Sequence, residues 1–389
     1  MEITHRERAA LVEAARAIAP VLRDNADQAE RESRLTDEAA DALREAGFFR
    51  LGVPRSSGGA EADLLTCLEV TSEVARACAS SAWVVALSYG AQRMAGSFGE
   101  QVRADLWGKD PDVALCGAFT GFGLVVTRTD GGQLVSGRWS AVSGCYQAGW
   151  AALGMPIVND DNERGLGLVP LDALSIEDTW DMAGMRGTGS NTLVADEVFV
   201  ADRYIRRFVD LMEGGGEGAE PFYRVPGRSL AMPLAAVLHG IARSAFEQTM
   251  DVVDSGKPLA MSTYSRLADS PGVQASLAEA ANLIDSAWLH MARSAEALSE
   301  AAEAGRRPDI TLRARGRMDA GHASRCLREA LQLLLTVSGA SSFSRAKVIE
   351  RNWRDLETAA RHPSLNEGLI REMYGRALAG VQEQASAMI

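Results

Sequence analysis

Hydrophobic and polar positions divide the chain into three zones with different periods. From about residue 6 to residue 107 the apolar residues, mostly Ala, Leu and Val, recur at helical spacing. Thr36 and Gly47 are typical of the start and the end of a helix. Glycine, proline and serine gather at 52–59, which favours a loop, and a second helical stretch covers 63–94. The first zone is therefore predicted to be helical.

The second zone, from about residue 113 to residue 204, has the shorter period of β-strands. Apolar segments at 124–129 and 133–137 flank Asp130-Gly131-Gly132, which favours a hairpin. Further apolar segments, each bounded by turn residues, follow at 150–158, 165–170 and 192–200. Short strands at this spacing predict a small β-sandwich or barrel.

The third zone is helical from Arg228 to the end of the chain. Candidate helices lie at 228–254, 271–304, 308–338, 344–360 and 366–384. Long helices with short connections are typical of an antiparallel four-helix bundle. The fold is thus predicted to be mostly α with a β domain, and the glycine-rich run at 214–218 is expected to be a linker or surface loop. The predicted domains are an N-terminal helical domain (1–112), a central β domain (113–215) and a C-terminal four-helix bundle (216–389).

Composition narrows the classes of partner and compartment. The 389 residues carry a formal net charge of -12, and an acidic surface repels nucleic acid and anionic membranes. The five cysteines show no C-x-x-C spacing, which argues against a zinc site or a disulfide framework. No signal-peptide core is present, nor an apolar stretch of the ~18 residues that a membrane span needs. A cytoplasmic protein without a metal, nucleic-acid or membrane partner is expected.

Several catalytic signatures are missing from the sequence. There is no G-x-S-x-G nucleophile elbow, no phosphate-binding Walker loop and no complete dinucleotide-binding glycine motif. Asp319-Ala320-Gly321-His322 is only a weak partial match to the paired Glu-x-x-His motifs of a di-iron bundle. Because no nicotinamide site is indicated, any electrons that the protein uses must arrive on another carrier.

Four segments, in order along the chain, resemble the acyl-CoA dehydrogenase superfamily, in its branch of two-component, reduced-flavin-dependent monooxygenases. They are Gly47–Gly59 with 63–83 after it, Ser136–Cys145, Gly184–Ser190 and Glu350–Asp355. The resemblance implies a helical N-terminal domain, a central β-domain and a C-terminal four-helix bundle. It also implies a homotetramer whose flavin sites lie at subunit contacts.

One departure separates this chain from many dehydrogenases of the superfamily. Those enzymes carry a glutamate shortly after the position of Asp355, and its carboxylate removes a proton from the substrate. This sequence instead has Arg361-His362-Pro363, and a histidine there resembles the hydroxylase branch. Members of that branch often carry a second, earlier histidine where this chain has Glu357, so proton abstraction by a histidine pair is not supported.

The resemblance also implies a set of site residues. His362 and Ser143 are the expected catalytic residues, both as hydrogen-bond donors at the oxygen adduct of the flavin; His362 is also expected to titrate near neutrality and move a proton. The implied cofactor-binding residues are Trp83, Trp139, Ala141, Val142, Ser143, Arg266, Ser341, Ser342, His362 and Pro363. Arg266 is expected to hold a flavin phosphate of a neighbouring subunit. The plainer alternatives are helix caps or turn formers for the histidine and serines, core packing for the tryptophans and a solvated side chain for Arg266.

The function that the resemblance implies is that of an oxygenase component which receives diffusible reduced FMN or FAD from a separate flavin reductase. With O2 it would hydroxylate a small organic substrate, preferably an aromatic or polycyclic natural product, as in antibiotic biosynthesis. Three alternatives stay open. They are an amine N-oxygenase, a true acyl-CoA dehydrogenase and a non-catalytic relative that serves as a binding or scaffold protein.

Overall fold

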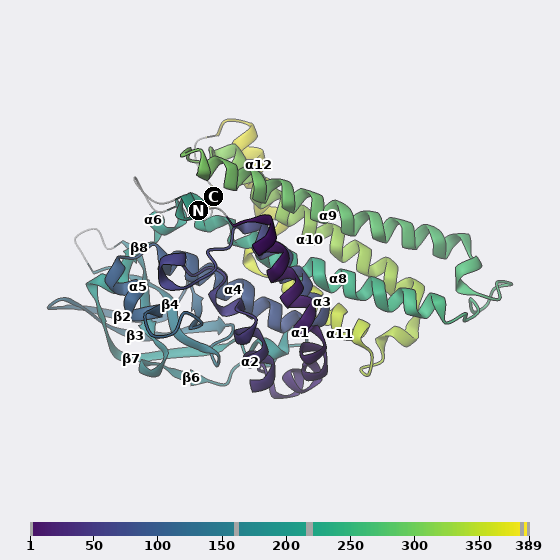
Figure 1. The fold of residues 1–389 in the computed structure, drawn as a ribbon, viewed down its shortest axis with the longest axis horizontal. Helices are drawn as coiled ribbons and strands as arrows, with labels where there is room; N and C mark the ends of the chain where they lie inside the picture. The colour runs from purple at the N-terminus through teal and green to yellow at the C-terminus, as the bar shows by residue number, and fades with distance from the viewer. Residues whose placement is uncertain (1–2, 159–162, 215–220, 382–384, 387–389) are drawn as a thin grey trace.

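The computed structural model describes residues 3–158, 163–214, 221–381 and 385–386, and its N-terminal part is helical as predicted (Figure 1). The helices of this part are α1 (His5–Glu32), α2 (Asp37–Glu45), α3 (Leu64–Ala77), α4 (Ala79–Gly96) and α5 (Glu100–Trp107). As the sequence indicated, the hydroxyl of Thr36 accepts the backbone N–H of Ala39 at the start of α2. The stretch 63–94 is interrupted at Cys78, whose backbone is extended (φ -151°), so that α3 and α4 are separate helices.

The middle of the chain forms a β-sandwich of two four-stranded sheets. The strands are β1 (Ala114–Ala118), β2 (Phe122–Thr129), β3 (Gly132–Val142), β4 (Ala148–Pro156), β5 (Arg164–Pro170), β6 (Ser175–Glu177), β7 (Asn191–Ala201) and β8 (Ile205–Arg207). One sheet has the order β1-β4-β5-β8 and the other β2-β3-β7-β6. The predicted hairpin is confirmed as β2–β3, with Gly131 at φ +71° in its turn. Buried side chains from both sheets, such as Val135 and Leu153, share one core.

The last part of the chain is a bundle of long helices (Figure 1). After the short helices α6 (Phe208–Met212) and α7 (Pro221–Arg224), it contains α8 (Ala231–Asp254), α9 (Pro271–Glu303), α10 (Ile310–Ser338), α11 (Val348–Ala359) and α12 (Glu367–Leu378). α10 packs against α8 and α9, α11 against α8, and α12 against α10. α11 begins four residues later than the predicted start at Ser344, because the chain first closes a turn from Ser344 to Lys347.

The two helical parts share a single hydrophobic core. α3 and α4 lie against α8, and one cluster of buried side chains includes Leu68 of α3, Val84 of α4 and Leu238 of α8. The predicted domain limits stay a prediction, and the limit at 215/216 lies, like most of the glycine-rich run, outside the described residues. The β-sandwich is thus inserted in the sequence between two parts of one helical core.

The structure also bears on membrane spans, metal sites and the cysteines. Among the described residues, no helix has both the length and the apolar character to cross a membrane. In the same part of the chain, no group of three or more His, Cys, Asp or Glu side chains could hold a metal ion. All five cysteines are buried free thiols.

His239 is a buried titratable group at the contact between α3 and α8. Its ring stacks on Trp288, and its Nδ1 lies 2.8 Å from the hydroxyl of Ser72. Burial, and then the charge of Arg243, lower its pKa from 6.5 to about 3. The imidazole is therefore neutral in the folded protein.

We predict that stability falls as the pH drops below about 6.5, because unfolded His239 then binds a proton that the folded residue binds only near pH 3. At pH 5 this residue alone should cost about 2 kcal/mol relative to pH 7.5. His239→Asn, whose amide can still bond to Ser72, should remove this part of the pH dependence. The urea midpoints of wild type and His239→Asn at pH 5 and pH 7.5 measure this pH dependence. If the midpoint shifts equally in the two proteins, His239 is not its source.

Candidate functional site

The four segments singled out in the sequence meet in the structure. The turn after β3 is joined to the loop 184–190, because the N–H of Gly144 donates to the carbonyl of Thr188 (2.9 Å). The same loop is joined to α11, because the N–H of Met185 donates to the carboxylate of Asp355 (2.5 Å). Segments far apart in the chain therefore build one local structure.

Glycine is required in this loop by close packing. A Cβ at Gly184 would lie 2.2 Å from the backbone oxygen of Arg354 in α11. At Gly187 it would lie 3.1 Å from the side chain of Ser80 in α4. The first distance excludes any side chain, so the loop can approach α11 only because position 184 is glycine.

Charged side chains of α11 hold the loop 184–190 in place. Arg354 donates to both oxygens of Glu350 (2.7 and 2.9 Å) and to the backbone oxygen of Ala183 (2.7 Å), and it also pairs with Glu30 of α1. Asp355 is buried, and burial raises its pKa to about 6 against the opposing effect of the Met185 N–H. These groups fix the position of the loop.

The residues of the site lie on or against one face of α4. Ser80, Trp83 and Val84 are three and four residues apart and therefore share a helix face. Ser80 lies against the loop at Gly187, and Val84 lies against the turn at Gly144. Trp83 meets the ring of His362 edge-on, with ring centroids 5.5 Å apart.

Ser143 ends a chain of three buried hydroxyl groups. The Thr188 hydroxyl donates to the carbonyl of Met185 (2.8 Å), which uses its only proton. Ser190 must therefore donate to Thr188 (2.6 Å), and Ser143 must donate to Ser190 (2.7 Å). The remaining lone pairs of Ser143 can only accept in this arrangement, which favours an acceptor role over the expected donor role.

The backbone beside Ser143 is strained and open to solvent. Ala141 is exposed and has φ +58°, a conformation that costs free energy for a residue other than glycine. The register between β3 and β7 shifts at the same place, between Trp139 and Val142. Val142 itself is fully buried. Such irregularities are frequent beside functional sites because they redirect the end of a strand.

His362 follows α11 and precedes Pro363, which begins a short 3₁₀ turn (Pro363–Leu365). Its Nδ1 accepts the backbone N–H of Ser364 (3.2 Å), so the predicted cap alternative is also present. Burial, and then the charge of Arg317, lower its pKa to about 4. The expectation that His362 titrates near neutrality is therefore wrong. At neutral pH the ring carries its single proton on Nε2 and offers one hydrogen-bond donor.

Other predicted site residues lie elsewhere. Trp139 is fully buried in the sandwich core, and its indole N–H donates to the carbonyl of Gly154 (2.8 Å). This placement favours core packing over the predicted cofactor contact.

Arg266 lies in the loop after α8, and Ser341 and Ser342 lie in the loop after α10. A shared cluster of buried residues brings these two loops to the same end of the bundle. His362 follows the other end of α11, whose 12 residues span about 18 Å. In this chain Arg266 pairs with Asp269 (2.6 Å) and is exposed. Ser341 accepts from Lys347, and Ser342 donates to Gly339. Their predicted flavin contacts therefore require a second copy of the chain, and they stay predictions.

The residue that the sequence analysis missed is Arg317 of α10. It is 4% exposed, and it lies on the same helix face as the buried Ala314, Ala320 and Gly321. The sequence did carry a signal for it. Arg317 is three or four residues from apolar neighbours, and this spacing places it on a buried face of the helix.

The site residues suit a flat heteroaromatic group. Ser143 supplies an acceptor, His362 an N–H donor and Trp83 an aromatic edge, from three different elements around one face of α4. An isoalloxazine ring has both donors and acceptors along its edge and an apolar face, so these residues fit a flavin.

Comparisons with known proteins agree with this assignment. Residues 4–103 match the acyl-CoA dehydrogenase N-terminal domain, and residues 232–367 match the acyl-CoA dehydrogenase C-terminal domain. The chain is 31% identical to the oxygenase subunit HsaA of a flavin-dependent monooxygenase from Rhodococcus jostii, over 92% of this chain and 95% of that protein. It is 32% identical to the oxygenase component of an FADH2-dependent resorcinol hydroxylase from a Rhizobium species, over 94% of this chain and 93% of that protein.

A solved structure of XiaF from a Streptomyces species, in complex with FADH2 and glycerol, superimposes with a TM-score of 0.93 at 32% identity, covering 97% of both chains. Sequence, fold and site geometry lead to the same family. The chain belongs to the acyl-CoA dehydrogenase superfamily, in its branch of oxygenase components of flavin-dependent monooxygenases.

Proposed function

We propose that this chain is the oxygenase component of a two-component monooxygenase that hydroxylates an aromatic or polycyclic organic substrate. It would use O2 and reduced FMN or FAD delivered by a separate flavin reductase. The fold and the family support the reaction class. The site supports it through one observation, a neutral imidazole at the place where many dehydrogenases of the superfamily carry a carboxylate base.

The carboxylates of α11 are all engaged and cannot replace that base. Glu350 is held by Arg354, and Asp355 accepts the N–H of Met185. Glu357, the position of the branch's second histidine, accepts from Arg328 and Arg361, and these partners lower its pKa despite its burial. This arrangement disfavours the acyl-CoA dehydrogenase alternative, and no feature of the site favours a scaffold role or N-oxygenation.

The chemistry requires electrons, a dry pocket and directed hydrogen bonds. Reduced flavin, when bound, supplies the two electrons with which one atom of O2 enters the substrate and the other becomes water. The protein contributes the hydrogen bonds: His362 donates from Nε2, and Ser143 accepts at the end of its hydroxyl chain. Trp83 adds an apolar side chain beside His362, and apolar surroundings would limit the access of water that favours release of hydrogen peroxide.

The preference for an aromatic substrate draws on the relatives. Two are named hydroxylases of resorcinol and of p-hydroxyphenylacetate, and a third is named an indole-3-acetate monooxygenase. All three names describe aromatic compounds, although identity to the last two is only 26–27%.

The purified chain alone should not oxidise NADH, because its sequence has no dinucleotide-binding motif. Adding an unrelated NADH:flavin reductase with FMN or FAD should give O2-dependent hydroxylation of a phenol from a substrate panel. NADH absorbance and product chromatography follow the two steps. Rapid NADH oxidation by the chain alone would refute the two-component assignment.

His362→Ala should fold but lose coupling, because the Nε2 donor is gone. We expect about 10- to 100-fold less hydroxylated product and a matching rise in hydrogen peroxide. His362→Gln, whose amide can donate from a similar place, should keep most of the activity.

The pH profile tests the protonation state of His362 separately. With a pKa of about 4, His362 should contribute no inflection between pH 6 and pH 8, and its own contribution should appear only as the pH approaches 4 and the ring gains a second proton. A wild-type inflection near pH 6.5 that disappears in His362→Gln would show that the residue acts as an acid or base instead.

Ser190→Ala should weaken binding of reduced flavin although Ser190 need not touch it, because the proton of Ser143 loses its acceptor and rotates. The loss of one neutral hydrogen bond corresponds to about 3- to 10-fold in affinity. Anaerobic titration with reduced FMN or FAD measures this change. Ser140→Ala removes an exposed serine of β3, three residues before Ser143, and is the control that should bind like wild type. Equal affinities of all three proteins would remove the hydroxyl chain from the site.

A further inference from the structure

Arg317 is a buried arginine that has no partner in the described part of the chain. It is 4% exposed, and its Nε and Nη1 atoms are sealed from solvent with no hydrogen bond. Across the described residues it forms no ion pair either. Burial lowers its pKa only to about 10, so the side chain keeps its positive charge at neutral pH. An isolated buried charge destabilises a folded protein, and such a group needs an explanation.

Several other arginines of this chain have acceptors. Arg354 contacts two carboxylates and a backbone carbonyl, and Arg351 pairs with Asp27. Arg93, whose Nε is unbonded, still donates through Nη2 to the backbone carbonyls of Phe222 and Val225. Among the described residues no acceptor faces Arg317, which is also more deeply buried than the half-buried Arg313 one turn away.

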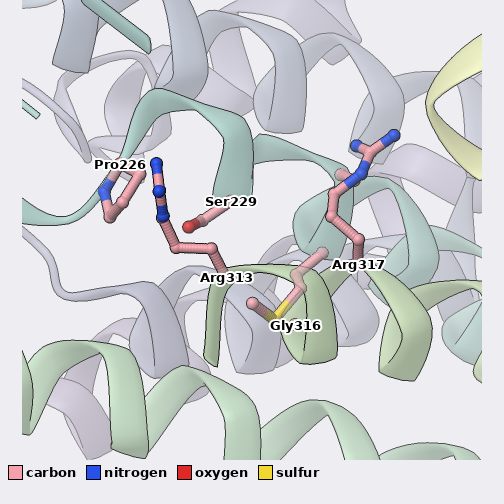
Figure 2. Close-up of a pocket in the computed structure, with 7 residues that line it drawn as sticks. Pro226, Ser229, Arg313, Gly316 and Arg317 are labelled. Carbon is pink, nitrogen blue, oxygen red and sulfur yellow. The ribbon is translucent and has the colours of Figure 1, made fainter. Parts of the chain in front are cut away.

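Arg317 also differs from its neighbour on the same helix. Figure 2 shows Arg313 directed toward Pro226 and Ser229 in a cavity between α8 and α10, whereas the guanidinium of Arg317 is directed away from them. α10 also packs against the 3₁₀ turn Pro363–Leu365 that directly follows His362. After burial, the charge of Arg317 lowers the pKa of His362 and so contributes to the neutral state of the imidazole.

We propose that Arg317 binds an anionic oxygen of the substrate, a phenolate or a carboxylate, beside His362. This inference rests on the proposed function and specifies the substrate that the site accepts. A guanidinium binds oxyanions through directed, charge-assisted hydrogen bonds. The uncharged His362 can add its Nε2–H without repelling Arg317. With a phenol, binding as the phenolate raises the electron density of the ring carbons at which oxygen would be added.

The test uses the protein without flavin, so that it does not depend on turnover. p-Nitrophenol is titrated against wild type, Arg317→Met and Arg317→Lys one pH unit below the pKa of the free probe, and the absorbance of the phenolate is recorded. p-Nitroanisole, which cannot ionise, is the neutral counterpart. Benzoate and benzamide form the second pair. Arg313→Met is the matched control, because Arg313 lies one turn away on the same helix but is directed elsewhere.

We expect wild type either to bind p-nitrophenol as the phenolate or to bind benzoate in preference to benzamide. The first result would identify a phenolate as the preferred anion, and the second a carboxylate. Arg317→Met should bind that anion about 10- to 100-fold more weakly, with unchanged affinity for the neutral counterpart, and Arg317→Lys should recover part of the loss. If Arg317→Met binds both anions like wild type, or if wild type prefers neither anion, the inference is wrong.

Thermal denaturation provides an independent readout. Replacing an unpaired buried charge by an apolar side chain of similar length should leave the midpoint unchanged or raise it. A clearly lower midpoint of Arg317→Met would show that the arginine is structural and would overturn the proposal. The reductase-coupled assay of wild type tests the oxygenase function separately, so either conclusion can fail alone.

Discussion

The site depends on the buried ionic groups of α11. Arg354 and Asp355 are adjacent, and between them they hold the backbone of Ala183 and Met185 and the carboxylate of Glu30 in α1. Asp355 is buried, and leaving a buried polar group without its hydrogen bond typically costs about 1–3 kcal/mol, and more for a charged group. The position of the loop, and with it the order of the hydroxyl groups up to Ser143, follows from this junction.

The same chain therefore uses arginine in two ways. At the half-buried Arg354 the charge is neutralised by the fold, and the residue holds segments together. At the buried Arg317 the described residues provide no neutralising group, and under our proposal the ligand would supply it. The difference lies in whether acceptors are present around the guanidinium.

Periodicity and turn residues were sufficient to predict the order of the helical and strand zones, because both patterns are local. The short strands β1, β6 and β8 were not among the predicted segments. The break at Cys78 was missed since it contains neither glycine nor proline. The motifs around Ser143, Gly184 and Asp355 were found as separate segments, but their contact was not predictable from spacing. The acceptor geometry of Ser143 and the lowered pKa of His362 were not predicted for the same reason. Both depend on groups distant in sequence. The Thr188–Met185 bond orients the hydroxyl groups, and burial in the folded protein, followed by the charge of Arg317, lowers the pKa of His362.

The shared helical core has a consequence for synthesis of the protein. The contact between Ser72 and His239 joins positions 167 residues apart, so the apolar faces of α3 and α4 are complete long before α8 leaves the ribosome. During that interval they are exposed, whereas the β-sandwich can close with its own strands. Long-range closure of this kind slows folding and exposes chains to aggregation. Shortening the chain after the sandwich would therefore yield not a smaller stable protein but a folded β domain carrying unprotected helices.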